Sequence, residues 1–362
     1  MLGGRIRGQG TYGCIFQPAL KCRNKKGKKF TEDPTMVGKL TSKGDAKNEI
    51  EIANLLNKLP DYNKYVIVST GELCTPKVKS KQTEQDLKQC DFINDQPIEE
   101  ARQLMMPWGG YPLSRINLDP YVFNYFKFVE ELLACGTFLV INGLCHFDIY
   151  GQNILFDKKN TPRFIDFGFT FQANKLKMAD LPLRWRQIGL DYDTEAPEVS
   201  LMLGTHSNYS VPDLVNGLGK VNPVVHRLAT LCDVNVEHWK SELTRWSNES
   251  NSFQDHDWLS CWKVYWPGFD AWAIGATLLH VLEIQSALPE FLESNAWKEK
   301  GSKIKSILRG LCRGHPAQRL DCAEALSLLT DGAHPLISSE SSDPSAKGAN
   351  WVDQKKKSRP PV

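Results

Sequence analysis

The sequence predicts an α+β protein with strands in a small N-terminal part and helices in a larger C-terminal part. Alternating apolar residues within 5–16 and an apolar segment at 36–40 indicate strands near the N-terminus. Apolar residues at helical spacing between 46 and 59 predict one main helix beside them. Longer apolar stretches at 122–142 and 271–282 predict that the remainder is mostly helical.

Length and composition are those of a globular chain with a sizeable core. The 362 residues suit one large two-lobed domain or two ordinary ones, and 41% of them are hydrophobic against 24% charged. The net charge of +2 argues neither for nor against nucleic acid, and no nucleic-acid partner is expected. No run of about 18 apolar residues occurs, so no membrane span is expected.

Ten cysteines are present, without a C-x-x-C pair and without a secretory signal at the start. This usage predicts free thiols in a reducing cytosol or nucleus. Zinc binding is disfavoured because paired spacing is missing.

The first informative stretch is rich in glycine and lies at 8–13. The segments on both sides of it alternate as strands do, so the glycines are expected in a hairpin, which argues against a dinucleotide-binding fold. Glycines allow backbone N–H groups to approach phosphate oxygens, although a plain hairpin turn explains a lone repeat equally well. Lys39 follows in the strand predicted at 36–40, and Asp45 can cap the helix that begins near Ala46.

The residues between this helix and the next long one are less regular. The polar segment 77–100 is predicted to be a mobile insertion between strands, and 103–110 runs from an apolar strand into a Gly-Gly turn. The long helix at 122–142 leads directly into His146.

The stretch that organises the chain lies at 145–155. It places Asp148 two residues after His146 and Asn153 five residues after that aspartate, and Asp166 follows eighteen residues past Asp148. Carboxylate and amide oxygens are what hard divalent cations prefer. A carboxylate in such a loop can also accept a proton from a hydroxyl.

These three residues resemble the catalytic loop and the Asp-Phe-Gly triplet of protein kinases. The resemblance implies that Asp148 is the catalytic base and that Asn153 and Asp166 hold Mg²⁺ beside ATP.

The glycine stretch and Lys39 resemble the kinase glycine-rich loop and its lysine. The resemblance implies that Glu49, or Glu51 as its rival, pairs with Lys39. It also implies that 103–110 contains the hinge whose backbone meets adenine, with Leu104 or Met106 as the gatekeeper. The implied ATP-binding residues are Gly8, Gln9, Gly10, Thr11, Tyr12, Gly13, Ile15, Lys39, Met106 and Leu155.

Three further marks follow in the order found in protein kinases. Glu195-Ala196-Pro197-Glu198 resembles the end of the activation segment, and Asp270 resembles the aspartate that anchors the catalytic loop. Arg319 resembles the arginine that pairs with the glutamate at the position of Glu198. Together the marks cover residues 8 to 326 and disfavour a kinase of small metabolites.

Three positions depart from the kinase pattern. Gly38 stands where alanine is usual, which would loosen nucleotide binding. Phe147 replaces the arginine that pairs with a segment phosphate, so we expect activity without phosphorylation of the segment. Tyr150 replaces a lysine near the γ-phosphate, which leaves a nucleotide-binding pseudokinase scaffold as the alternative.

The resemblance therefore implies a bilobal protein-kinase fold and a serine/threonine kinase that acts on protein substrates. The expected boundaries are 1–107 for a β-rich lobe with one main helix, 108–335 for a mostly helical lobe, and 336–362 for a disordered basic tail. An insertion at about 200–266 is expected to bury its tryptophans in a small core of its own, with a partner dock as the alternative.

The glycine stretch, the loop at 146–149 and the absent lysine most resemble divergent kinases of large DNA viruses. The resemblance implies an intracellular location, in the host cytoplasm or nucleus if the protein is viral, with packaging in the virion as a further option. The basic cluster in the tail is either a nuclear signal or a solvated end.

Overall fold

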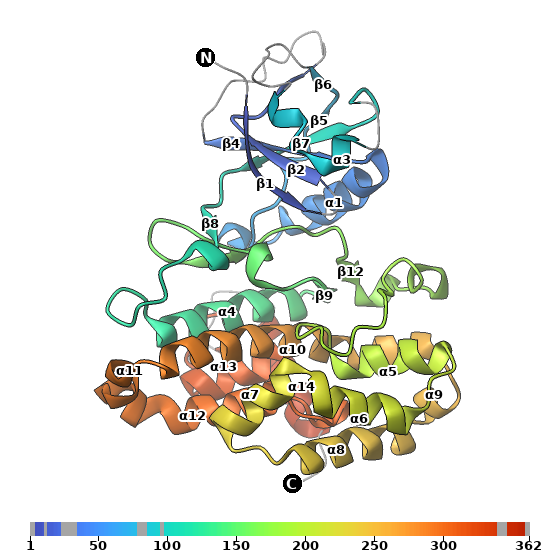
Figure 1. The fold of residues 1–362 in the computed structure, drawn as a ribbon, viewed down its shortest axis with the longest axis vertical. Coiled ribbons are helices and arrows are strands. Elements are labelled where there is room, and N and C mark those ends of the chain that lie inside the picture. The colour runs from blue at the N-terminus through green and yellow to red at the C-terminus, as the bar shows by residue number, and fades with distance from the viewer. Residues whose placement is uncertain are drawn as a thin grey trace. The chain divides into compact units, whose positions relative to one another are not determined.

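The computed structural model describes residues 4–10, 13–22, 35–77, 85–94, 98–338 and 346–358. The chain divides into two compact units. Unit 1 comprises Met1–Gly110 and Arg163–Gly168, and unit 2 comprises Tyr111–Pro162 and Phe169–Val362. Unit 1 is rich in strands and unit 2 is mostly helical, which confirms the predicted α+β class (Figure 1).

Unit 1 is built on a five-stranded antiparallel sheet with the strand order β1-β2-β4-β7-β5. Its strands are β1 (Arg5–Gly10), β2 (Gly13–Gln17), β4 (Met36–Thr41), β7 (Arg102–Pro107) and β5 (Leu73–Cys74). Gly10 lies opposite Gly13 in the β1–β2 pair, so the predicted hairpin is confirmed. A two-residue strand β3 (Lys21–Cys22) pairs separately with β6 (Pro76–Lys77).

Helix α1 (Lys43–Leu56) packs against β7 and begins slightly earlier than predicted. The cap is Ser42, whose hydroxyl accepts from the backbone N–H of Asp45 at 3.1 Å, so the expectation that Asp45 caps the helix is wrong. Ser42 has the extended backbone that a capping residue needs, while Asp45 is already in the first helical turn.

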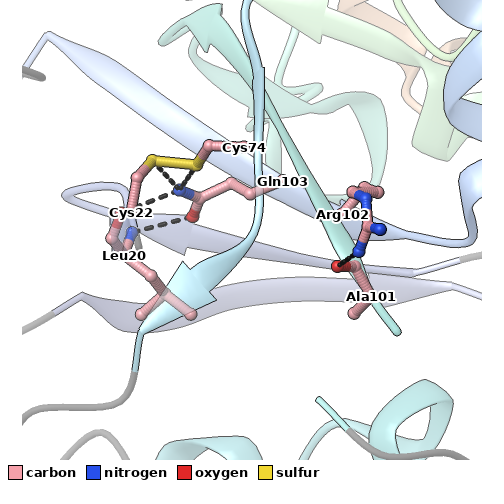
Figure 2. The surroundings of a disulfide bond; sticks show 6 residues. All are labelled: Leu20, Cys22, Cys74, Ala101, Arg102 and Gln103. Atoms are coloured by element: carbon pink, nitrogen blue, oxygen red, sulfur yellow. Dashed lines mark hydrogen bonds between the residues drawn. A yellow bond between two sulfur atoms is a disulfide. The ribbon is translucent and has the colours of Figure 1, made fainter. Parts of the chain in front are cut away.

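Two disulfides join segments of unit 1, and the expectation that every cysteine is a free thiol is wrong. Cys14 is bonded to Cys90. Figure 2 shows the second disulfide, between Cys22 and Cys74. Cys90 is fully buried and precedes the short helix α3 (Asp91–Asn94), so this part of the supposed mobile insertion packs into the unit.

Unit 2 is a helical body organised around α10 (Trp258–Ser286), which includes the stretch predicted at 271–282 and is mostly buried. The predicted helix at 122–142 is α4 (Tyr125–Val140), and the Tyr125 hydroxyl ties it to α10 through the Leu278 carbonyl. The other helices are α5 (Pro197–His206), α6 (Val211–Val221), α7 (Pro223–Cys232), α8 (Val236–Glu249), α9 (Asn251–Gln254), α11 (Pro289–Glu293), α12 (Asn295–Leu311), α13 (Cys322–Thr330) and α14 (Lys347–Ser358).

Short strands frame the loops of unit 2. They are β8 (Tyr111–Pro112), β9 (Leu144–Cys145), β10 (Ile154–Phe156) and β12 (Phe171–Gln172), while β11 (Pro162–Phe164) lies where the chain passes back to unit 1. Strand β8 pairs with β10, and β9 pairs with β12, so residues 146–153 are held between two paired strands.

The tryptophans of the expected insertion are buried, as predicted. Trp239, Trp246, Trp258, Trp262 and Trp266 are each less than a tenth exposed. They do not form one separate core, however. The Trp262 ring lies 4.8 Å from the Phe147 ring of the central loop, because Trp262 belongs to the buried face of α10.

The expectation of a disordered tail over 336–362 is wrong for residues 347–358, which form α14. Trp351 donates from Nε1 to Asp321 at 2.8 Å, and its ring lies 5.9 Å from that of Trp266. Val352 is buried beside it, so this helix has an apolar face that the basic composition of the tail conceals. Within the described ranges, no helix meets the length and apolarity that a membrane crossing requires.

Candidate active site

In unit 1, three of the predicted site residues meet around one ammonium group. The Lys39 Nζ lies 2.8 Å from a carboxylate oxygen of Glu49 and 2.7 Å from Oδ1 of Asp166. The side chains of Lys39 and Glu49 are 8% and 5% exposed, whereas that of Asp166 is 31% exposed. Glu51 is exposed, so the choice between the two glutamates falls to Glu49.

The two carboxylates determine the charge of this lysine. Burial alone would lower the pKa of Lys39, but the negative charges of Glu49 and Asp166 more than offset it and raise the pKa above its ordinary value. Lys39 is therefore a permanent cation, held on a central strand and aimed at Asp166.

Asp166 reaches Lys39 because its segment is attached to unit 1 by backbone hydrogen bonds. The Phe164 N–H donates to the Tyr65 carbonyl at 3.0 Å, and the Ile67 N–H donates to the Phe164 carbonyl at 2.9 Å. Asp166 itself has φ +63°, the left-handed region, so the chain turns at this residue after β11 has ended at Phe164. The Asn48 amide of α1 holds the end of the turn through the Gly168 carbonyl at 2.6 Å.

The glycines of the β1–β2 hairpin serve two different purposes. Gly13 has φ +153°, and a Cβ there would lie 1.9 Å from the Leu40 carbonyl oxygen, so packing requires glycine at this position. A Cβ at Gly8 or Gly10 would meet no heavy atom of the described chain within 4 Å. Internal packing therefore does not explain those two glycines, whereas close approach of a ligand to the backbone would.

The remaining predicted nucleotide contacts are only partly described. Gln9 lies on β1, while Thr11 and Tyr12 lie outside the described residues. Ile15 packs against a buried cluster that contains both Met106 and Leu104. The choice between these two residues as gatekeeper therefore stays open. Leu155 is a half-buried residue of β10, which belongs to unit 2.

Gly38 is explained by a neighbour that the sequence did not indicate. A Cβ at Gly38 would lie 2.2 Å from Oε1 of Gln103 on β7. The Gln103 side chain is fully buried and is fixed by two hydrogen bonds to Leu20 (Figure 2). Its oxygen accepts from the Leu20 N–H at 2.8 Å, and its nitrogen donates to the Leu20 carbonyl at 2.7 Å. The Gln103 side chain already occupies the space that an alanine methyl at position 38 would fill. Gly38 therefore leaves no empty space between β4 and β7.

In unit 2, the central loop is anchored by Asp270 of α10. Its carboxylate accepts from the backbone N–H of His146 at 2.7 Å and of Phe147 at 2.9 Å, as predicted for this aspartate. Burial raises the pKa of Asp270 to about 6, although the two N–H donors oppose this shift. Phe147 has φ +62°, and the two hydrogen bonds hold the backbone in this sparsely populated region.

Asp148 and Asn153 are brought together by this loop. The Asn153 Nδ2 donates to both the backbone carbonyl and a carboxylate oxygen of Asp148, each at 2.9 Å. Because the amide nitrogen of Asn153 is engaged by Asp148, its oxygen is the atom that could coordinate a cation. A carboxylate at 166 and an amide oxygen at 153 are ligand types that Mg²⁺ accepts.

One residue near Asp148 was missed by the sequence predictions. Arg186, from the segment 169–195, forms an ion pair with Asp148 through Nη2. No motif spacing predicts it, because the segment has little regular structure and the contact spans 38 residues. The sequence offered one signal for this contact: Tyr150 carries no charge, and the segment that follows contains an arginine at 186.

Within the residues that the structure describes, no three or more His, Cys, Asp or Glu side chains are grouped to hold a metal ion. The predicted Mg²⁺ pair contains an amide and one carboxylate from different units, so it stays a prediction. Compared with known proteins, the chain matches no protein-family model and no curated protein sequence.

Proposed function

We propose that this chain is a serine/threonine protein kinase with the bilobal kinase fold, which transfers the γ-phosphate of ATP to protein hydroxyls with the help of Mg²⁺. The observation that carries the proposal is the arrangement around Lys39 in unit 1. Lys39, Glu49 and Asp166, which were all predicted to act at bound ATP, meet at the buried ammonium group of Lys39. Asp166 lies 127 positions from Lys39 in the chain.

The chemistry of both units supports this activity. Phosphoryl transfer depends on positioning and on charge stabilisation, which a fixed lysine and Mg²⁺ ligands supply. Lys39 would hold the nucleotide phosphates, and Asp166 with the Asn153 oxygen would bind Mg²⁺, which neutralises phosphate charge when bound. Asp148 would accept the proton of the substrate hydroxyl, because its carboxylate is oriented by Asn153 on a loop braced by Asp270.

The test is labelled ATP with a library of serine, threonine and tyrosine peptides, with and without Mg²⁺. We expect transfer to serine and threonine peptides that requires Mg²⁺ and that Asp148→Asn or Lys39→Met abolishes. Asp213→Asn and Lys47→Met are matched controls, since both residues are exposed on helices and both variants should retain wild-type rates.

A nucleotide-binding scaffold without turnover is the second candidate, because Tyr150 carries no charge where kinases place a lysine. Labelled ATP that binds in a Lys39-dependent manner, with incorporation no greater for the wild type than for Asp148→Asn, would favour the scaffold and overturn the kinase proposal. Phosphorylation of metabolites without any protein acceptor would indicate a small-molecule kinase.

A further inference from the structure

Arg186 is held in place by several residues of unit 2. Its Nη2 bonds Asp148 and also donates to the Phe147 carbonyl at 3.3 Å, while its Nη1 donates to the Tyr192 hydroxyl at 3.0 Å. The guanidinium carbon lies 5.0 Å from the centre of the Phe169 ring and 5.3 Å from that of Tyr192. A long flexible side chain is thus fixed at the carboxylate by hydrogen bonds and by aromatic faces.

The guanidinium remains charged and partly accessible in this position. Burial alone would lower the pKa of Arg186, but Asp148, Tyr192 and Glu195 together more than offset it and raise the pKa. The Arg186 side chain is 24% exposed and that of Asp148 is 14% exposed. The two residues line one small pocket with Thr194 and Glu195, which has room for about one water molecule.

Tyr150 leaves the transfer reaction short of one positive charge. In the proposed reaction, the substrate oxygen bonds to the γ-phosphorus while the bond to the bridging oxygen breaks, and ADP leaves with that electron pair. The hydroxyl proton passes to Asp148. Negative charge is spread over the transferring group during this step, and a fixed cation beside it lowers the barrier.

Asp148 must be within hydrogen-bonding reach of the attacking hydroxyl, so a group bonded to Asp148 lies near that hydroxyl, which itself approaches the γ-phosphorus. As Asp148 takes up the proton, its negative charge is neutralised, and the positive charge of Arg186 is no longer balanced by it. We propose that Arg186 is a catalytic residue that provides the cation absent at position 150 and stabilises the transferring phosphate. This inference rests on the proposed kinase activity.

Arg184 offers a matched control within the same segment. It donates to the backbone carbonyls of Asp180 and Thr170 and lies over the Phe171 ring, so it also braces the segment. Its guanidinium bonds those backbone carbonyls, whereas that of Arg186 bonds the Asp148 carboxylate. Loss of Arg184 therefore reports what a structural arginine contributes to the rate.

The experiment compares kcat and KM for ATP and peptide in the full chain, with melting temperature as a fold control. Arg186→Met should lower kcat by roughly 10²–10³-fold with little change in either KM, since the interaction is made in the transition state. Arg186→Lys should retain part of the rate, and Arg184→Met should stay within a few-fold of the wild type. Tyr150→Lys added to Arg186→Met should regain at least roughly tenfold, because it returns a cation to the site.

Several outcomes would overturn the assignment while leaving the kinase proposal standing. The first is an active wild type whose kcat is matched by Arg186→Met, and the second is an Arg186→Met variant with a higher kcat. The third is an equal loss of kcat in Arg184→Met and Arg186→Met that Tyr150→Lys does not reverse. A faster variant would instead identify Arg186 as an inhibitory clamp on Asp148. A wild-type chain that transfers no phosphate would overturn the kinase proposal and this assignment together.

Discussion

Glu198 and Arg319, 121 residues apart in the chain, form an ion pair in which neither side chain is exposed to solvent. The Arg319 Nη1 donates to the Glu198 carboxylate at 2.6 Å, and the guanidinium also lies 5.2 Å from the centre of the Trp272 ring. The pair joins the start of α5 to the loop before α13, as the sequence predicted.

Removing one member of this pair should destabilise unit 2 severely. Arg319→Met leaves the Glu198 charge buried without its partner, and we expect the free energy of unfolding to fall by about 3–5 kcal/mol. The double variant with Glu198→Gln should lose less than Arg319→Met alone, because no charge is then stranded. Urea denaturation of the four proteins tests this, and strictly additive losses would contradict it.

Gly38 and Gln103 should be coupled in the same way on the sheet of unit 1. Gly38→Ala should be destabilising because the new methyl overlaps Oε1 of Gln103, and Gln103→Ala should cost the two hydrogen bonds to Leu20. In the Gln103→Ala background the added methyl should be neutral or favourable, which a double-mutant cycle measures as coupling. Gly44→Ala, where a Cβ meets only the Ser42 hydroxyl at 3.7 Å, should be stabilising, and a destabilised Gly44→Ala would undermine the steric explanation.

Asp270 should make stability fall as pH rises between about 4 and about 6. Its folded pKa of about 6 exceeds the value of about 3.9 in an unfolded chain, so the folded state alone retains the proton in this window. Across this pH window, the free energy of unfolding of the wild type should therefore fall by up to about 3 kcal/mol relative to that of Asp270→Asn. Asp257→Asn is the control of opposite sign, because the Ser260 hydroxyl lowers the pKa of Asp257 and its contribution is lost as pH falls. If the difference in the free energy of unfolding between the wild type and Asp270→Asn does not change with pH, this explanation is contradicted.

The two disulfides of unit 1 should make its stability depend on reductant. They join residues 76 and 52 positions apart, and Cys90→Ser or Cys74→Ser should each lower the free energy of unfolding by about 2–4 kcal/mol in oxidising buffer. The difference from the wild type should shrink in dithiothreitol, where the wild type loses the same cross-links. Cys135→Ser changes a buried cysteine that belongs to neither disulfide, so its effect should be independent of reductant. Mass spectrometry that finds ten alkylatable thiols in the oxidised protein would contradict the pairing.

The kinase activity we propose should not require phosphate on the segment 169–195. Phe147 stands where an arginine would bind that phosphate, and its ring packs 5.7 Å from Phe269 and 6.0 Å from Phe171 instead. Phosphatase-treated protein, shown by mass to be free of phosphate, should therefore keep the rate of untreated protein. An inert dephosphorylated protein that segment phosphorylation activates would refute this expectation.

The sequence by itself determined the α+β class and the strands and helices that carry most of the predicted site residues. The hairpin at 8–13, the strand that carries Lys39 and the helix that carries Glu49 all follow from local apolar periodicity and from glycine, which are properties of neighbouring residues. The resemblance to protein kinases added the pairs Lys39–Glu49 and Glu198–Arg319, because the motifs that carry these residues follow in the kinase order. Beyond these elements, the same periodicity failed for α14, whose single apolar face was hidden by charge.

Only the tertiary structure decided several contacts between residues that are far apart in the chain. They are the contact of Arg186 with Asp148, the overlap of Gln103 with the space above Gly38 and the pairing of Cys14 with Cys90. Such contacts depend on how the whole chain closes, since a loop without a repeating period carries no record in the sequence of what lies across from it. The charge next to Asp148, on which we base the assignment of Arg186, therefore became visible only when the chain was folded.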